Sequence, residues 1–374
     1  IKMIKKQKLL TLVVFILSSI FLMLCTNPTE PKETLLPEKE YEPGTRDYVW
    51  SIDTLNIDAP FNYYTKIWGS SPNDIWIVGG GPKENMQILR FNGDSVYSIY
   101  DIDITSTPWS VFGFDSNDVW IGGSNFDFKH YDGTSLTLNN ILYKKDYIMS
   151  AFSDIWGTSH SHLMAAGGIL HSTDVIYGVV MIYNGVKWEY AEEPIPNLQF
   201  TTVRKSLYED DYFLLGFKLG NNSPDSSFFY RYYGNEISKL DIGTSYPPSK
   251  KYIGLMDETI YFINNKIIYK LWDGAIKQKI SLANTIASSE RIIGRDEKDF
   301  FIQCDGGIGH YNGSNLALVY NIDERFGIVD GIVFENDVYF MGFYKDSLIF
   351  FLIKGQKNIN DTIQKSIFNN YNMY

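Results

Sequence analysis

The chain has 374 residues, of which 44% are hydrophobic and 16% aromatic, and its formal net charge is −11. This apolar content excludes a wholly disordered chain. The negative charge argues against nucleic-acid binding, because proteins that bind nucleic acids neutralise phosphates with basic side chains. Two cysteines are too few for a disulfide framework. Aromatic side chains favour pleated, half-buried strands, so the composition indicates β structure.

Residues 1–25 have the pattern of a lipoprotein signal peptide. Four lysines precede an apolar run from Leu9 to Leu24, which is short for crossing a bilayer of ~30 Å but typical of a signal peptide. The run ends in Leu22-Met23-Leu24-Cys25, which resembles the lipobox of bacterial lipoproteins. The resemblance implies that Cys25 is the lipid attachment residue, although Leu24 stands where that family prefers a small residue. The alternative is an uncleaved signal-anchor helix.

Residues 26–47 are rich in proline and glutamate, which favours an extended, flexible tether over a packed element. A signal peptide and a tether of this kind place the rest of the chain outside the cytoplasm. We therefore expect a protein of the cell envelope, bound through its lipid to the outer membrane on the periplasmic or the surface face.

Three segments repeat one motif: residues 67–79 (IWGSSPNDIWIVG), 111–123 (VFGFDSNDVWIGG) and 155–167 (IWGTSHSHLMAAG). Four weaker copies bring the number to seven. They lie at residues 208–212, 256–260, 295–300 and 335–339.

Each copy is followed by a turn that ends in glycine, and successive turns lie 39 to 52 residues apart. Asn-Gly and Asp-Gly between apolar runs are strong hairpin signals. Two hairpins in each repeat give four strands, and this period is typical of a propeller blade. The glycines are Gly93, Gly133, Gly185, Gly234, Gly274, Gly313 and Gly355.

The sequence therefore predicts an all-β fold, a seven-bladed β-propeller of four-stranded antiparallel blades over residues 48–355. The last copy ends with a strand at residues 348–354, so its blade lacks an outer strand. Residues 48–55 look like an outer strand without a blade. We expect this N-terminal strand to complete the seventh blade and close the ring, with residues 356–374 as a tail or an extra strand.

The segment IWGSSPNDIWIVG resembles the Trp-Gly-x-Ser-x-Asn-Asp-Val-Trp repeat of bacterial secreted and lipid-anchored β-propellers. The resemblance covers residues 48–355 and is sharp in the first three repeats. It implies the architecture and a location in the cell envelope. That family shares no reaction, so no catalytic residue can be carried over.

Three histidines, His160, His162 and His171, fall within 12 residues and could be interpreted as metal ligands. The repeat instead places His160 and His162 in an exposed turn and His171 on the opposite rim, which favours structural roles. His130 and His310 occupy repeat positions and are also predicted to be structural.

Five acids, which recur once per repeat, could do acid–base work or bind Ca²⁺. Recurrence at one turn is better explained by Asx-type hydrogen bonds to the backbone. Cys304 is expected to be buried and inert. We expect no cofactor and no metal, and no catalytic motif such as GxSxG is present. The five acids are Asp74, Asp118, Asp211, Asp299 and Asp337.

The loops that join strands B–C and D–A of a propeller line the mouth of its channel, where ligands usually bind. Long B–C loops are predicted in the first, third and fourth blades, and long loops on a rigid scaffold often carry function. Equally, they could be solvated variable loops. The candidate ligand residues are Lys83, Glu84, Asn85, His171, Asp174 and Asp225.

Three functions remain open. The first is a monomeric, non-enzymatic module that binds an unknown protein or glycan, with a membrane contact through the lipid and no nucleic-acid partner. The second is a glycan-active hydrolase or lyase, which would need unpaired, buried carboxylates of raised pKa at the channel mouth. The third is an outer-membrane assembly scaffold that pairs with a partner strand.

Overall fold

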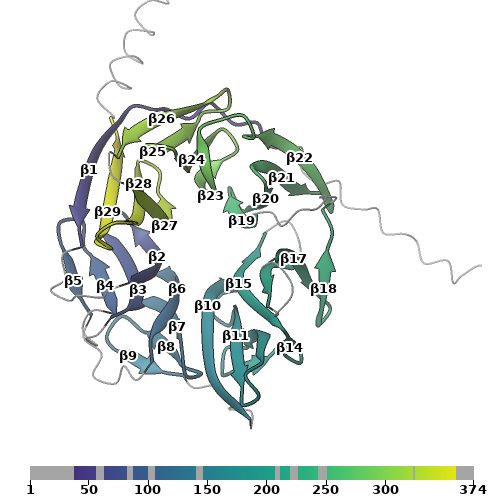
Figure 1. The fold of residues 1–374 in the computed structure, drawn as a ribbon. Coiled ribbons are helices and arrows are strands. Elements are labelled where there is room, and N and C mark those ends of the chain that lie inside the picture. Colours follow the sequence, from purple (N-terminus) through teal and green to yellow (C-terminus); the bar gives the residue numbers. More distant parts are fainter. Residues whose placement is uncertain are drawn as a thin grey trace, which may run out of the picture. The chain divides into compact units, whose positions relative to one another are not determined.

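Seven antiparallel sheets form a ring in the unit Tyr41–Tyr374 of the computed structural model (Figure 1). The structure describes residues 38–55, 63–81, 87–99, 106–139, 146–206, 211–219, 226–242, 251–322 and 325–358. Across these ranges the regular elements are strands, and no helix is long and apolar enough to cross a membrane. The predicted all-β, seven-bladed propeller is confirmed.

Each sheet is one blade, and its strands are lettered A to D outward from the centre (Figure 1). The A strands are β2 (Tyr63–Ser71), β6 (Pro108–Asp115), β10 (Tyr147–Ser159), β15 (Leu198–Lys205), β19 (Lys251–Met256), β23 (Ala287–Asp296) and β27 (Phe326–Val333). The B strands are β3 (Asp74–Gly80), β7 (Asp118–Gly123), β11 (His162–His171), β16 (Tyr212–Lys218), β20 (Thr259–Asn264), β24 (Asp299–Cys304) and β28 (Asp337–Tyr344).

The outer half of each blade is a second hairpin. The C strands are β4 (Ile88–Phe91), β8 (Phe128–Tyr131), β12 (Ile176–Tyr183), β17 (Ser226–Tyr233), β21 (Ile267–Trp272), β25 (Gly307–Tyr311) and β29 (Phe350–Lys357). The D strands are β5 (Val96–Ser98), β9 (Leu136–Leu138), β13 (Trp188–Tyr190), β18 (Glu236–Leu240), β22 (Ala275–Ser281), β26 (Leu316–Asn321) and β1 (Tyr48–Thr54). Blade 3 has a fifth strand, β14 (Ile195–Pro196), which pairs with β12.

The hydrophobic core of the described ring is divided into seven clusters, one between each pair of neighbouring blades. Strand β3 shows why. Its Ile75 and Ile77 pack toward blade 7, whereas Trp76 and Val78 pack toward blade 2. Side chains alternate between the two faces of a strand, so a strand between two blades is apolar at every position.

Glycine pairs near the ends of the B strands allow a close approach to the A strands. A Cβ atom on Gly79 would lie 2.0 Å from the carbonyl oxygen of Tyr63. Gly167 has the same relation to Ala151, at 2.2 Å. Both glycines lie within their strands, so the B strand continues through them.

The turns between strands C and D have the predicted chemistry in blades 1 to 6, where each predicted glycine has φ > 0. The seventh predicted turn is wrong, because Gly355 lies inside β29, which continues to Lys357 and pairs with β1. In blade 1, Asn92 accepts hydrogen bonds from the backbone N–H groups of Asp94 and Ser95, and Gly93 has φ = 95°. Asp132 does the same in blade 2. An Asx acceptor followed by glycine explains why these turns are so visible in the sequence.

The N-terminal strand closes the ring as expected. Strand β1 pairs antiparallel with β29 from Tyr48↔Lys357 to Thr54↔Phe351 and becomes the outer strand of blade 7. In Figure 1 the purple β1 lies along the yellow β29. The Trp50 ring fills the space beside Gly355, where a Cβ would lie 2.5 Å from the ring.

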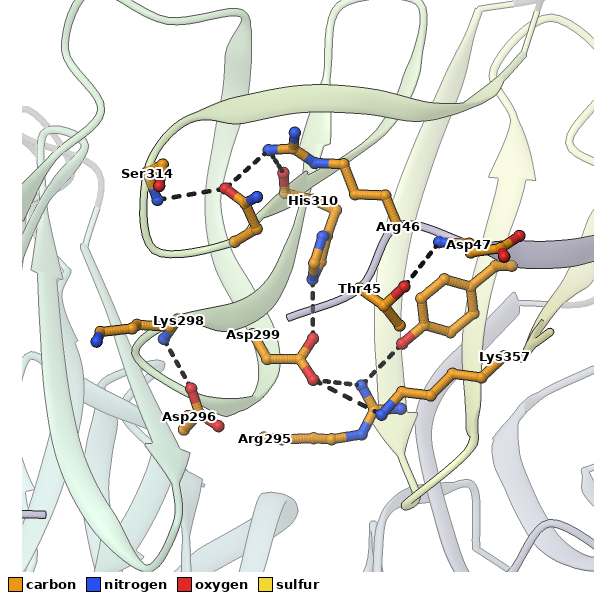
Figure 2. A network of polar contacts seen from close by, with 12 residues as sticks. Thr45, Arg46, Asp47, Arg295, Asp296, Lys298, Asp299, His310, Ser314 and Lys357 are labelled. Atoms are coloured by element: carbon orange, nitrogen blue, oxygen red, sulfur yellow. Dashed lines mark hydrogen bonds and ion pairs between the residues drawn. The ribbon is translucent and has the colours of Figure 1, made fainter. Parts of the chain in front are cut away.

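Residues 41–47, which the sequence assigns to the end of the tether, bind to blades 5 and 6 before the chain enters β1; we call them the strap. Tyr41 donates a hydrogen bond to Asp257 of blade 5 at 2.8 Å. Gly44 N–H donates to the carbonyl of Lys298 in blade 6 at 2.9 Å. Arg46 reaches the side chain of Asn312 at 3.1 Å (Figure 2). The last seven residues of the expected tether are therefore held against the ring.

Candidate functional site

The predicted loop residues lie partly outside the described structure. Lys83, Glu84, Asn85, Asp225 and the proposed lipid attachment residue Cys25 belong to ranges that the structure does not describe.

His171 and Asp174 lie together in the turn between β11 and β12. The ring nitrogen Nδ1 of His171 accepts the backbone N–H of Thr173 at 3.2 Å, and Asp174 has φ = 62°. The carbonyl of His171 accepts the N–H of Asp174 at 2.9 Å. The imidazole is therefore part of the local turn, and neither residue lines the central cavity.

The structure separates the three clustered histidines. His160 bonds to Asp118 of blade 2, whereas the His162 ring lies 6.0 Å from that of Tyr212 in blade 4. Burial, followed by the charge of Lys205, lowers the pKa of His162. No group of three metal-binding side chains occurs in the described part of the chain.

The five recurring acids are partnered with side chains, which corrects the prediction of Asx-type backbone bonds. Each lies at or just before the start of a B strand and contacts a basic or imidazole group of the adjacent C strand. The pairs are Asp74–Arg90 (2.5 Å), Asp118–His130 (2.8 Å), Asp211–Arg231, Asp299–His310 (2.8 Å) and Asp337–Lys354 (3.7 Å).

The Asx role belongs to earlier residues of the same turns. Asp115 accepts the N–H of Asn117 at 2.7 Å, and Asp296 accepts the N–H of Lys298 at 2.7 Å. The recurring acid was assigned to a backbone partner because its basic partner lies more than ten residues further along the chain. The pairs tie strand B to strand C, and His130 and His310 have the structural role expected of them.

Asp299 of blade 6 lies next to His310, Arg295 and Lys357, as Figure 2 shows. Its carboxylate accepts from His310 at 2.8 Å and from Arg295 at 3.0 Å, and the ammonium of Lys357 in β29 is 4.0 Å away. Arg295 also donates to the hydroxyl of Tyr48 in β1 at 3.0 Å. Burial opposes ionisation, but these partners outweigh it and lower the pKa of Asp299.

A carboxyl of raised pKa occurs on the same side of blade 6, away from the channel lining. Burial raises the pKa of Asp296, as do the neighbouring carboxylates of Asp299, Asp257 and Glu297. Because Asp296 accepts the Lys298 N–H in its own turn, it serves the hairpin.

The best candidate site is a cavity of about 320 Å³ at the centre of the ring. All seven A strands contribute to its lining. Its walls combine Trp68, Trp156 and aliphatic side chains with a belt of charges that the sequence analysis did not single out. Four charges of this channel belt line the cavity, namely Lys66, Asp154, Arg204 and Asp330. The fifth, Arg291, is not a lining residue and joins the belt through its ion pair with Asp330.

Asp154 is the centre of the first half of the belt. One carboxylate oxygen lies 2.9 Å from the ammonium of Lys66, and the other accepts Arg204 and the backbone N–H of Val203. The guanidinium of Arg204 also stacks over the Trp156 ring at 4.9 Å. Burial raises the pKa of Asp154, but the charges of Arg204 and Lys66 outweigh this effect and lower it.

Asp330 holds the second half. It accepts Arg291 at 2.8 Å and, with its other oxygen, the backbone N–H of Ile67 in blade 1 at 3.4 Å. Arg291 stacks over the Tyr252 ring at 5.0 Å. Burial lowers the pKa of Arg291, but Asp330 and also the more distant Asp154 raise it above its ordinary value. The two halves therefore form one electrostatic unit.

A bulge places these charges. The pairing of strands A and B shifts by one residue just before Lys66, Asp154 and Asp330, which turns their side chains toward the centre or the next blade. The sequence contains a pattern that could have identified two of these charged residues. Lys66 and Asp154 both lie three residues before the glycine of a Trp-Gly motif, in strands that are otherwise largely apolar.

No protein-family model matches the chain, and no curated protein sequence matches it. Solved structures do. YCF48 bound to a D1 peptide aligns with a TM-score of 0.56 at 14% identity, over 84% of this chain and 99% of that one. Oligogalacturonate lyase in complex with manganese aligns with a TM-score of 0.56 at 9% identity, over 85% and 98%.

The β-propeller domain of the Trilobed protease from Pyrococcus furiosus also aligns, with a TM-score of 0.50 at 12% identity, over 81% of this chain and 97% of that one. That domain has an open Velcro topology, whereas β1 and β29 close the ring in this chain. At such identities the likeness defines the fold, a β-propeller, and no activity.

Proposed function

We propose that this chain is a non-enzymatic binding protein of the cell envelope, and that its ring holds a segment of a protein partner at the central channel. The observation that carries the proposal is the pairing of the channel carboxylates. Asp154 and Asp330 are both engaged by cations, and the pKa of Asp154 is lowered. A glycan hydrolase needs a carboxyl that gives up a proton near neutral pH, whereas a rigid, mixed polar and apolar cavity suits recognition.

A solved propeller of similar architecture supports a protein ligand. YCF48 was determined with a D1 peptide bound, and its fold covers most of this chain. The precedent shows that a propeller of this architecture can bind a peptide.

The location is part of the same proposal. Cys25 would carry the lipid, and residues 26–40 would be the tether, because the strap belongs to the ring. Growth with an alkyne-labelled fatty acid should label the full chain, and Cys25→Ser should abolish the label. Labelling that survives in Cys25→Ser would refute this attachment.

Site-specific photo-crosslinking tests where a partner binds. The crosslinker p-benzoylphenylalanine in place of Leu255, which lines the cavity, should yield one protein adduct in cells of the source organism. In place of Val186, an 80% exposed residue in the outer turn of blade 3, it should not yield that adduct. An adduct formed only from position 186 would refute channel binding.

The enzyme alternative has its own readout. The purified chain should leave neutral and anionic oligosaccharides intact, as measured by reducing ends and by the absorbance of unsaturated products. Turnover of either class of oligosaccharide by the purified chain would replace binding with glycan cleavage as the function.

A further inference from the structure

Resting on the proposed function, we infer that the channel belt binds a carboxylate of the partner, so the partner presents an acidic peptide segment. The belt contains three cations and two carboxylates, an excess of one positive charge at the centre of a chain whose net charge is −11. A local positive site inside an anionic protein concentrates anions where the rest of the surface repels them.

The hydrogen bonds within the channel belt indicate whether a ligand should be an anion or a cation. Both oxygens of Asp154 and both oxygens of Asp330 already accept a hydrogen bond or an ion pair. A cation entering the channel would find these carboxylates engaged. In contrast, some N–H groups of Arg204 and Arg291 make no hydrogen bond to a described residue.

A guanidinium has five N–H groups. Among the described residues, Arg291 donates from Nη1 to Asp330 alone, and Arg204 donates from Nη1 to Asp154 and to the carbonyl of Val203. The Nε and Nη2 groups of both arginines are absent from the buried, unpartnered atoms of the described chain. Arg204 lines the cavity, and the guanidinium of Arg291 contacts Tyr252 and Asp330, which also line it. A planar fork of donors at this position matches a carboxylate.

The orientation of the two arginines is fixed before a ligand arrives. Arg204 lies over Trp156 and Arg291 over Tyr252, so each guanidinium is held by a ring on its face and by an acid at one edge. Such preorganisation lowers the entropy lost on binding.

The same inventory favours a peptide over an anionic sugar. Sugar hydroxyls bring many O–H donors, and the carboxylate oxygens of the belt are already engaged by the protein's own cations. The walls between the charges are apolar, with Val111, Ile155 and Ile332 among them. An acidic side chain or a chain terminus next to apolar residues fits this lining.

The test uses a fluorescein-labelled hexaglutamate peptide and its hexaglutamine counterpart, with fluorescence anisotropy as the readout on the ring that begins at Tyr41. Hexaglutamate should bind at least about tenfold more tightly than hexaglutamine, and raising salt from about 50 to 200 mM should weaken it. Arg291→Gln should weaken hexaglutamate at least tenfold. Lys187→Gln removes the same charge from an exposed pair with Glu189 outside the channel and should change affinity less than twofold.

A second variant controls for folding, because Arg291→Gln leaves Asp330 without its cation. The double variant Arg291→Gln/Asp330→Asn keeps the net charge of the belt and should also lose at least tenfold in affinity. Equal binding of the two peptides, equal binding by wild type and the double variant, or no binding of hexaglutamate would overturn the inference. Binding of trigalacturonate without hexaglutamate would make the ligand an anionic glycan.

Different results would refute the binding function and the carboxylate site. A partner crosslinked from position 255 in both wild type and Arg291→Gln would keep the binding function and refute the carboxylate site. Loss of the adduct in Arg291→Gln and its retention in Lys187→Gln would support both.

Discussion

Lys66 of blade 1 contacts Asp154 of blade 3 at 2.9 Å, although blade 2 lies between these two blades in the ring. One lysine side chain therefore connects two blades that are not neighbours in the ring. Together with Asp330, which accepts the backbone N–H of Ile67 across the seam between blades 7 and 1, this contact makes the channel belt a set of ties between blades. Ring stability and the proposed binding would therefore depend on the same residues.

Asp154→Asn should be strongly destabilising. The substitution leaves Arg204 and Lys66 without their anionic partner in a cavity that exposes little of either side chain. Removing one member of a buried pair typically costs about 3–5 kcal/mol. The matched control is Asp346→Asn, which breaks an exposed pair with Arg325 and should cost less than about 0.5 kcal/mol in urea unfolding. Equal effects of the two changes would contradict the buried pairing.

Acid should unfold the ring by protonating paired carboxyls. The pKa values of Asp154 and Asp299 are lowered in the folded chain. A depressed folded-state pKa adds stability that is complete above the unfolded value of about 3.9 and is lost as the pH falls through the folded value. The urea midpoint should stay level down to about pH 5 and fall steeply below about pH 4. Asp154→Asn should show a smaller fall over the same range, and an unchanged acid limb would contradict the assignment.

The strap should stabilise the ring. A chain that begins at Tyr41 keeps the bonds of Tyr41 to Asp257 and of Arg46 to Asn312, whereas a chain that begins at Tyr48 loses them. These contacts and the burial of Tyr41 predict a difference of about 2–4 kcal/mol in the free energy of unfolding. Identical urea curves for the two chains would show that the strap contacts the blades without stabilising the ring.

Gly79→Ala should cost about 2–3 kcal/mol, because the new Cβ would meet backbone atoms of Tyr63 and Tyr64 that cannot move without shifting the inner strand. Gly234 provides the comparison. Its φ is 58° and a Cβ there meets nothing within 4 Å, so Gly234→Ala should cost about 1 kcal/mol from backbone strain alone. Thermal melts of both variants give the order, and a larger loss at Gly234 would be the contrary result.

Cys304 should be unreactive in the folded ring. Its side chain is buried, and burial raises its pKa to about 12. In the chain that begins at Tyr41 it is the only cysteine. Ellman's reagent near pH 8 should therefore react roughly 100-fold more slowly in buffer than in denaturing urea. Rapid reaction in buffer would mean that blade 6 opens.

The repeats predicted the number of blades and the closing strand because both depend on local chemistry. Turns such as Asn92-Gly93 require φ > 0, and B strands such as β3 must be apolar on both faces. These constraints act within a few residues and therefore leave a pattern in the sequence.

The site was harder to predict because its partners are far apart in the chain. Asp330 and Ile67 are 263 residues apart, and Arg204 lies 50 residues beyond Asp154. No turn or strand constraint within a few residues requires a charge at these positions. A single charged residue in an inner strand therefore does not indicate a site. The basic partners of the recurring acids were missed for the same reason, since each acid was interpreted through its own turn.

The strap also determines how the molecule would respond to a mechanical load. A pull on the chain before Tyr41 first meets the bonds of Tyr41, Gly44 and Arg46 to blades 5 and 6. It reaches the β1–β29 ladder, which begins at Tyr48↔Lys357, only after those bonds break. The closure of the ring is thereby shielded from tension applied at its own N-terminal end.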